Sequence, residues 1–294
     1  MSRRLYRRVV KVGNSYYVSL PKEWITAHGF RQGDLIPLEL SEEGVIVIRP
    51  LRLSGRRTPR VRVIEGVRDP FREIVRAYLA GYEVIEVRRL GEPLKKSLDR
   101  LLRLLVGLEI VEEGVDRAVL QCFIREDYDV RQVLARMDSL SRSMYVDAAV
   151  GLEQQDSSLL ESVVARDDKL DRLYFLAVRL LRSSSLSPVL DSRERMFLVD
   201  ARLVAKILEE IGDEAERMSM ARIGEGRKIK GIVKLAKAIA RCQEVVVERF
   251  IKGRCSIPPP ELKVSLESSV SREEPWNSLN RIACMVLDLA EIAY

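Results

Sequence analysis

Apolar residues recur every three or four positions through the second half of the chain, and this spacing predicts helices. The pattern covers residues 130–152, 159–182, 199–218 and 229–251, and a last segment runs over residues 274–294. A proline run at residues 258–260 interrupts the pattern, and only a short helix over residues 262–269 fits after it. Residues 128–294 are therefore predicted to form a helical domain.

The segment 159–182 carries two acidic residues, four positions apart. Projected at about 100° per residue, Asp167 falls inside the apolar stripe between Leu160 and Tyr174, and Asp171 falls at its edge. A carboxylate that faces a protein core is unfavourable unless it is hydrogen-bonded, ion-paired or bound to a cation. This pair therefore predicts a hydrogen-bonding, ion-pairing or cation-binding role in addition to helix packing.

The segment 199–218 carries a second pair, Glu209 and Asp213, with the same spacing. Its predicted core stripe consists of large apolar residues and leaves the acidic pair outside: Leu203, Ile207, Ile211 and Met218. The pair is instead bordered by small residues that allow another helix to approach closely: Ala201, Ala205 and Gly212. We expect both pairs to converge where the two helices, antiparallel and adjacent, face each other.

The first 60 residues predict short strands around one helix. Residues 8–12 and 16–20 are rich in β-branched and aromatic side chains, and the segment from Gly13 to Ser15 between them is a turn signal. Pro21 opens a short helix that Gly29 closes, and further strands are predicted over residues 35–40 and 45–48.

The positive charge of the chain is concentrated in the same region. Residues 1–60 hold 12 Lys and Arg against 5 Asp and Glu, a net +7, and the rest holds 38 against 39, a net −1. This concentration predicts a polyanionic partner for residues 1–50, continued by a basic Pro/Gly/Ser linker over residues 51–60. The residues expected to contact DNA are basic side chains and the polar residues of the turn: Arg7, Arg8, Lys11, Asn14, Ser15 and Lys22.

Residues 61–124 predict a small α/β sandwich in the order β-α-β-α-β-β. The strands are expected over residues 61–64, 84–87, 108–112 and 117–124, and the helices over residues 70–80 and 93–106. This region contains no glycine-rich phosphate loop and no catalytic constellation. It is therefore predicted to be a connector or dimerisation module.

The acidic segments resemble the PhoU family of phosphate-uptake regulators, through RDDKLDRLYFL at residues 166–176 and RLVAKILEEIGDEA at residues 202–215. The resemblance implies an antiparallel bundle of two three-helix repeats, metal binding by the acidic pairs, and components of the phosphate ABC transporter as partners. Residues 281–291 resemble the closing helix of a second repeat, where Asn280 and Cys284 replace the acidic pair. A second metal site is therefore not expected, and any cluster should rest on the first repeat.

The N-terminal region resembles the swapped-hairpin barrels of the AbrB and MazE families. The resemblance rests on KVGNS at residues 11–15, LPKEW at residues 20–24 and the pair Gly33-Asp34, although Ile25 and Thr26 stand where AbrB-type helices often have arginines. It implies a homodimer that binds DNA through basic residues on one face. About 50 residues bury little surface alone, which also favours an obligate dimer.

Side-chain chemistry limits the enzymatic alternatives. All-oxygen ligation suits Mg, Mn, Ca or ferric iron, and the resemblance favours iron or another transition metal. The only histidine is His28, which we interpret as a surface residue near a helix end, so a Glu-x-x-His di-iron site and a histidine triad are excluded from the bundle. The four cysteines are scattered, as in a reduced cytoplasmic protein, and neither a membrane span nor a signal peptide is expected.

Taken together, the sequence predicts a multidomain α+β protein that is not an enzyme. We expect a cytoplasmic, DNA-binding transcriptional regulator of phosphate uptake with a PhoU-like metal-binding bundle. Two alternatives stay open, a metal-dependent hydrolase or other carboxylate-metal enzyme and an antitoxin-like repressor. A hydrolase would need a substrate pocket and a general acid or base beside the carboxylates, and antitoxins of this type end in a short disordered tail rather than in patterned domains.

Overall fold

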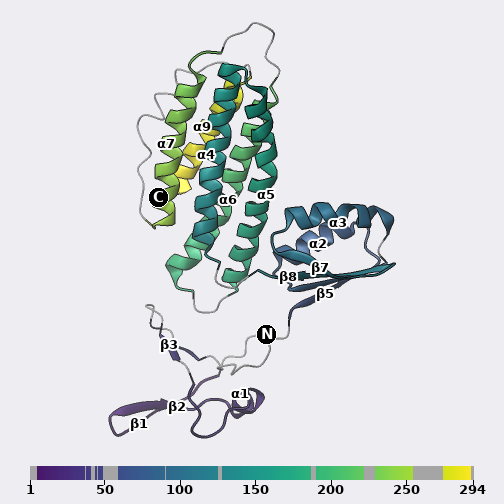
Figure 1. Ribbon diagram of the computed structural model, residues 1–294. Coiled ribbons are helices and arrows are strands. Elements are labelled where there is room, and N and C mark those ends of the chain that lie inside the picture. The colour runs from purple at the N-terminus through teal and green to yellow at the C-terminus, as the bar shows by residue number, and fades with distance from the viewer. Residues whose placement is uncertain are drawn as a thin grey trace. The chain divides into compact units, whose positions relative to one another are not determined.

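The computed structural model describes residues 5–36, 38–40, 44, 46–48, 59–89, 91–124, 128–186, 190–221, 229–253 and 274–292. The chain divides into two compact units, Met1–Arg57 and Thr58–Tyr294, which are described separately (Figure 1). Most of the predicted basic linker lies outside the described residues. No helix in the described part of the chain is both long and apolar enough to cross a membrane.

The described residues of the first unit form two small antiparallel hairpins and one helix. Strand β1 (Val9–Val12) pairs with β2 (Ser15–Val18), helix α1 spans Lys22–Ala27, and β3 (Leu38–Leu40) pairs with β4 (Ile46–Ile48). The predicted order is confirmed with small shifts in the ends. The described strands form two separate sheets rather than a closed barrel, and no described residue of this unit is buried.

A two-residue loop, Gly13-Asn14, joins the first hairpin. Val12 pairs directly with Ser15, so Ser15 belongs to the strand rather than to the turn. Gly13 has a φ of +61°, a conformation that glycine adopts without steric strain. Glycine at the first position of a two-residue loop is typical of tight hairpins, and it fixes the register of this one.

The second unit begins with a four-stranded sheet covered on one face by two helices (Figure 1). The strands are β5 (Val61–Ile64), β6 (Val84–Arg88), β7 (Leu108–Glu113) and β8 (Arg117–Cys122), in the order β5-β6-β8-β7, and the helices are α2 (Pro70–Leu79) and α3 (Glu92–Leu104). Strands β5 and β6 are parallel, and the other pairs are antiparallel. The predicted α/β sandwich is confirmed, with Tyr78 and Leu101 fully buried between the layers.

The remaining described residues of the second unit form five long helices: α4 (Val130–Gln154), α5 (Ser157–Ser185), α6 (Ser192–Ser219), α7 (Ile232–Ile251) and α9 (Trp276–Ile292). Asp129, Asp156 and Asp191 cap α4, α5 and α6 by accepting backbone N–H groups of the first turn. The cap at Asp191 explains why α6 begins seven residues before the predicted start. The short helix expected over residues 262–269 lies outside the described residues.

The predicted core stripe of α6 is partly wrong. Leu203 is 52% exposed, although Ile211 and Met218 are buried as expected. The buried face of α6 contains both small and large residues: Ala201, Val204, Ala205, Leu208, Ile211, Gly212, Ala215 and Met218. A Cβ atom placed on Gly212 would lie 2.2 Å from Cδ2 of Leu170 on α5.

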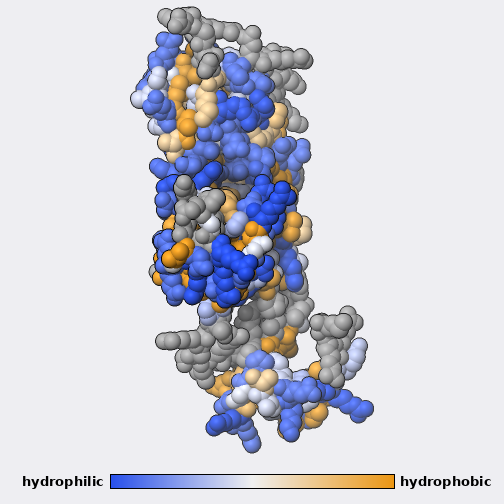
Figure 2. Space-filling model, turned by 90° about the vertical axis from the view of Figure 1, so that its right-hand side faces the viewer, coloured by the Kyte–Doolittle hydropathy of each residue, from blue (hydrophilic) through white to orange (hydrophobic). Residues whose placement is uncertain are grey.

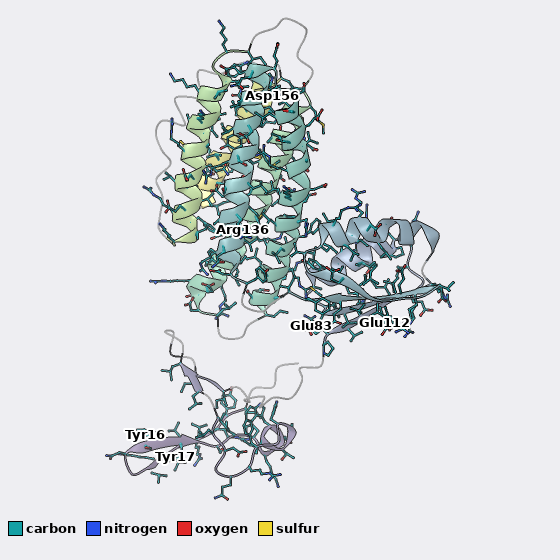
Figure 3. The ribbon with its side chains drawn as sticks, in the orientation of Figure 1. Tyr16, Tyr17, Glu83, Glu112, Arg136 and Asp156 are labelled. Atoms are coloured by element: carbon teal, nitrogen blue, oxygen red, sulfur yellow. The ribbon has the colours of Figure 1, made fainter. Side chains whose placement is uncertain are left out.

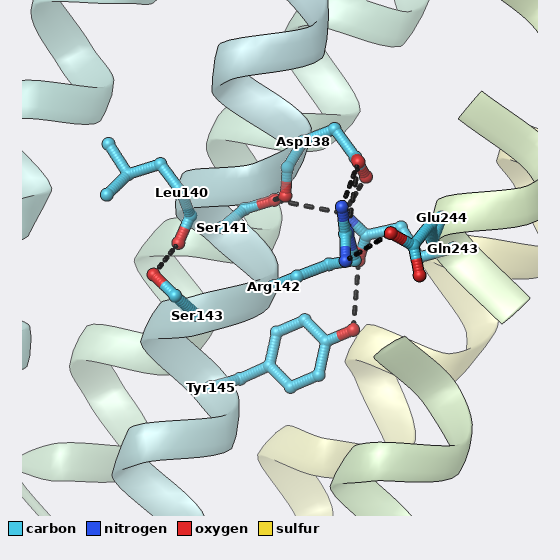
Figure 4. A network of polar contacts seen from close by, with 8 residues as sticks. All are labelled: Asp138, Leu140, Ser141, Arg142, Ser143, Tyr145, Gln243 and Glu244. Atoms are coloured by element: carbon cyan, nitrogen blue, oxygen red, sulfur yellow. Dashed lines mark hydrogen bonds and ion pairs between the residues drawn. The ribbon is translucent and has the colours of Figure 1, made fainter. Parts of the chain in front are cut away.

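A buried polar network joins α4 to α7 (Figure 4). The side-chain amide of Gln243 donates to Oδ1 of Asp138 at 2.9 Å and to Oγ of Ser141 at 3.0 Å. Its oxygen accepts from the hydroxyl of Tyr145 at 3.1 Å, while Arg142 pairs with the other oxygen of Asp138 at 2.9 Å. Because these polar groups are buried and bonded to each other, the network fixes how α7 lies against α4.

The α/β layer packs directly on α5. The guanidinium of Arg179, which is only 7% exposed, donates to the backbone carbonyl of Tyr78 and lies 4.8 Å from the centre of the Tyr78 ring. A Cβ atom on Gly81 would lie 3.2 Å from Oγ of Ser183, so the backbone after α2 also approaches α5 closely. The sheet domain and the bundle are therefore joined by buried contacts and not only by the chain.

We expect Gly212→Ala to destabilise the second unit by about 1–3 kcal/mol, because the new methyl group overlaps Leu170 in a packed core. Alanine is favoured over glycine in a helix by about 1 kcal/mol, so helix propensity alone predicts the opposite sign. Thermal unfolding of both proteins measures the difference. Gly114→Ala is the control, since a Cβ atom there makes only an ordinary contact at 3.5 Å. A raised melting temperature in Gly212→Ala would contradict the close approach.

Candidate functional site

The predicted DNA contacts of the first unit are all exposed, but the hairpin places two of them, Lys11 and Ser15, on opposite faces. Directly opposed residues of an antiparallel pair lie on the same face, and successive residues alternate between faces. Lys11 pairs with Tyr16, and Ser15 pairs with Val12, so Lys11 and Ser15 point to opposite faces. Arg7 and Arg8 precede β1, Asn14 lies in the loop, and Lys22 begins α1.

His28 has local contacts only within the described part of the first unit. One of its ring nitrogens lies 2.7 Å from the carbonyl oxygen of Trp24, and the two ring centres are 4.7 Å apart. His28 is the C-terminal cap residue of α1, and its side chain is exposed. These contacts support its interpretation as a surface residue near a helix end.

The carboxylates of α5 and α6 gather along one line of contact, which we call the acidic seam. It consists of three residues from each helix: Asp167, Asp168 and Asp171, with Glu209, Asp213 and Glu216. Oδ1 of Asp167 on α5 lies 3.7 Å from the place that a Cβ atom of Gly212 on α6 would occupy. The same close packing that buries α5 against α6 thus brings their carboxylates together.

Burial and mutual repulsion raise the pKa values in the seam. Burial is the largest cause for Asp167, and the carboxylates of Glu216, Asp171 and Asp213 add to it, which raises the pKa of Asp167 to about 7. Burial also raises the pKa of Asp171 and of Asp213. The seam is therefore a place where negative charge is held against its electrostatic preference.

Lys206 and Arg217 partly neutralise the seam, although burial keeps the pKa of Asp213 raised. Lys206 forms a close ion pair with Glu209 and a second with Glu210 at 3.3 Å. Burial raises the pKa of Glu209 in spite of this partner. Arg100, which belongs to α3 of the α/β layer, lowers the pKa of Asp171 but does not offset its burial.

Two arginines next to the acidic pairs in the sequence have partners outside the seam. Arg166 pairs with Asp147 on α4 at 2.8 Å, and Arg202 donates to the hydroxyl of Tyr174 at 2.9 Å. Ion pairs with neighbouring arginines are the simplest alternative to a bound cation for neutralising the carboxylates of the seam. These two arginines do not serve that purpose.

The donor atoms of the seam suit a hard cation, but their arrangement does not form a ready-made site. Carboxylate oxygens are the ligands that Mg, Mn and ferric iron prefer. Among the residues that the structure describes, however, no three acidic, histidine or cysteine side chains are arranged so that they would hold a metal ion together. Lys206 also engages Glu209, so a cation at that carboxylate would have to displace it.

The sequence candidates do not include three residues at the seam: Asp168, Glu216 and the neighbouring Lys206. Glu216 lies three positions after Asp213 and seven after Glu209, so it shares their face of α6, and this spacing was an available signal. Lys206 lies three positions before Glu209 and was recognisable in the same way. The contribution of Arg100 depends on how the α/β layer packs on α5, which no local spacing reveals.

Comparison with known proteins assigns two segments of the chain. The family model described as antidote-toxin recognition MazE, bacterial antitoxin, matches residues 9–55, and the PhoU domain model matches residues 134–221. The crystal structure of PhoU from Pseudomonas aeruginosa is similar at a TM-score of 0.47 and 20% identity, over 57% of this chain and 95% of that chain. A search of curated proteins gives no match. The chain thus joins a MazE/AbrB-like segment to a PhoU-like segment.

The raised pKa of Asp167 predicts a pH-dependent stability in metal-free protein. Between the ordinary value of 3.8 and about 7, the folded state keeps a proton that the unfolded state has released, so stability falls as pH rises through this range. Asp167→Asn removes the contribution of Asp167, whereas Asp171 and Asp213 still contribute in the same direction. The melting temperature of this variant should equal that of the wild type near pH 4 and exceed it by about 2–4 °C at pH 8.

Thermal unfolding in chelator across this pH range measures the effect. The control is Glu161→Gln, which neutralises an exposed carboxylate on the same helix and should leave the difference from the wild type independent of pH. Equal pH dependence in Asp167→Asn and the wild type would show that the seam carries no electrostatic strain at Asp167.

Proposed function

We propose that this protein is a DNA-binding regulator of phosphate uptake. The proposal rests on one observation: the chain contains both a MazE/AbrB-like segment and a PhoU-like segment. A MazE/AbrB-like segment lies in the region that holds a net charge of +7, and a PhoU-like segment lies in the remainder, whose net charge is −1. The first suggests contact with a polyanion, and the second suggests a response to phosphate transport.

The first unit is proposed to act as a homodimer. It has no buried residue in its described part, and many of its large apolar side chains are exposed by half or more (Figure 2). These residues come from both hairpins and would be covered by interleaving with a second copy: Val9, Val10, Val12, Tyr17, Val18, Leu38, Leu40 and Ile46. Burial of apolar surface contributes about 25 cal/mol per Å², so dimerisation would supply the core that one copy lacks.

The acidic seam is proposed to bind a cation as part of the response to phosphate status. Supporting it are the crowding of carboxylates from two helices and the raised pKa values of Asp167 and Asp213. Components of a phosphate ABC transporter are the proposed upstream partners. The contacts between Arg179 and Tyr78 provide a rigid connection from α5 to the α/β layer.

A second candidate function is toxin neutralisation, and the description of the matched MazE model favours it. The two functions differ in what residues 61–294 do. A regulator needs the bundle for its response, whereas an antitoxin needs only a segment that binds the toxin. Both functions are compatible with DNA binding by the first unit, so the tests below begin with DNA.

The DNA prediction follows from the charge distribution. A chain truncated to residues 61–294 should not bind duplex DNA, whereas the full-length protein should bind with an affinity that falls steeply with salt, because bound phosphates release counterions. Arg8→Ala should weaken binding on all sequences alike and lower the salt slope by about one. Fluorescence anisotropy over a series of salt concentrations measures both quantities.

The matched control is Arg193→Ala, which removes an exposed arginine from α6 and changes the net charge by the same amount. Its affinity and salt slope should equal those of the wild type. If the truncated chain binds DNA as tightly as the full-length protein, the assignment of DNA binding to the first unit is wrong.

The cation prediction uses variants that act in opposite directions. Asp167→Asn combined with Asp213→Asn should abolish binding of Mn, Mg or Fe and remove the stabilisation that a bound ligand gives the folded state. Lys206→Met removes the internal cation beside Glu209 and should tighten binding roughly tenfold, on the order of one charged hydrogen bond. Calorimetric titration and metal analysis measure the affinity and the content.

Glu161→Gln is again the control, and it should bind metal as the wild type does. A wild-type protein that stays metal-free after incubation with each of these ions would remove the proposed cation site. DNA binding by the first unit would be unaffected by that outcome.

A further inference from the structure

Two adjacent tyrosines of β2 lie on opposite faces of the first hairpin. Figure 3 labels both tyrosines. In the strand register, Tyr16 pairs with Lys11, and Tyr17 pairs with Val10. Residues paired across an antiparallel ladder share a face with Cβ atoms about 4.5–5.5 Å apart. Tyr16 is 70% exposed and Tyr17 is 56% exposed. Tyr16 and Tyr17 are therefore both well exposed, but their neighbours across the strand pair differ.

The face of Tyr17 is apolar along both strands. It holds Val10, Val12 and Tyr17, with Ser15 as the polar exception next to the loop. Such a face suits the covered side of a dimer.

The face of Tyr16 is apolar at its base, where Val9 pairs with Val18. It becomes polar towards the loop, where Tyr16 stands beside Lys11. The polar end of this face is the part of the hairpin strands that presents a cation together with a neutral hydrogen-bond donor.

We propose that Tyr16 is a direct phosphate contact, whose hydroxyl donates to the DNA backbone beside the ammonium group of Lys11. Tyrosine is among the side chains that bind phosphate oxygens, and a hydrogen bond to a charged acceptor is stronger than a neutral one. The proposal rests on the proposed function, because it requires that the first unit bind DNA. Tyr17 has no such role, since its face carries no cation.

The test separates a neutral contact from a charged one. Tyr16→Phe removes only the hydroxyl and should lower the affinity of the full-length protein for a random-sequence duplex about five- to tenfold. It should leave the slope of log affinity against log salt unchanged, because no charge is lost. Lys11→Ala should lower both the affinity and the slope, the slope by about 0.9.

Tyr17→Phe is the matched control and should bind like the wild type. If Lys11→Ala weakens binding and Tyr16→Phe does not, the phosphate contact by Tyr16 is wrong while DNA binding stands. If Tyr17→Phe loses affinity and Tyr16→Phe does not, the two faces have been assigned the wrong way round. A wild-type protein that binds no duplex at low salt would overturn the proposed function together with this contact.

Discussion

The close approach of α5 and α6 at Gly212 is the constraint on which the candidate cation site depends. A glycine at this point lets Leu170 fill the space of a missing side chain, and the small residues Ala201 and Ala205 extend the same buried face. The packing places carboxylates from both helices in one half-buried seam, where burial and repulsion raise the pKa of Asp167 to about 7. Packing and charge therefore oppose each other here, and natural proteins often tolerate such conflict at functional sites.

Helix α5 connects this seam to the rest of the second unit. Asp171 and Arg179 lie eight residues apart on it, so about 12 Å of rigid helix separates the seam from the buried contact with Tyr78. Arg100 reaches the electrostatic surroundings of Asp171 from α3, on the α/β layer. A change of charge in the seam would thus alter the electrostatic environment of both the bundle and the α/β layer. On the other side of the bundle, the network around Gln243 holds α7 to α4.

Periodicity predicted most elements of the fold because the elements are long or strictly alternating. Strand β5 was predicted to the residue, and the α/β order was confirmed throughout. The core face of α6 was predicted only in part, because Ile211 and Met218 are buried as expected while Leu203 faces solvent and small residues such as Ala205 are buried instead. The seam's acidic pairs were visible from spacing alone, whereas the influence of Arg100 depends on tertiary contact. A closed barrel in the first unit was expected, and the described strands of a single copy form two separate hairpins.

The central claim is that the fold holds carboxylates in the seam against their electrostatic preference, so that a cation can relieve the strain. The most direct test is a carboxyl-carbon NMR titration of Asp167 in metal-free protein, repeated with Mg. The account predicts a pKa of about 7 without metal and a much lower pKa with it. A metal-free pKa near the ordinary aspartate value of about 3.9, unchanged by Mg, would contradict the account.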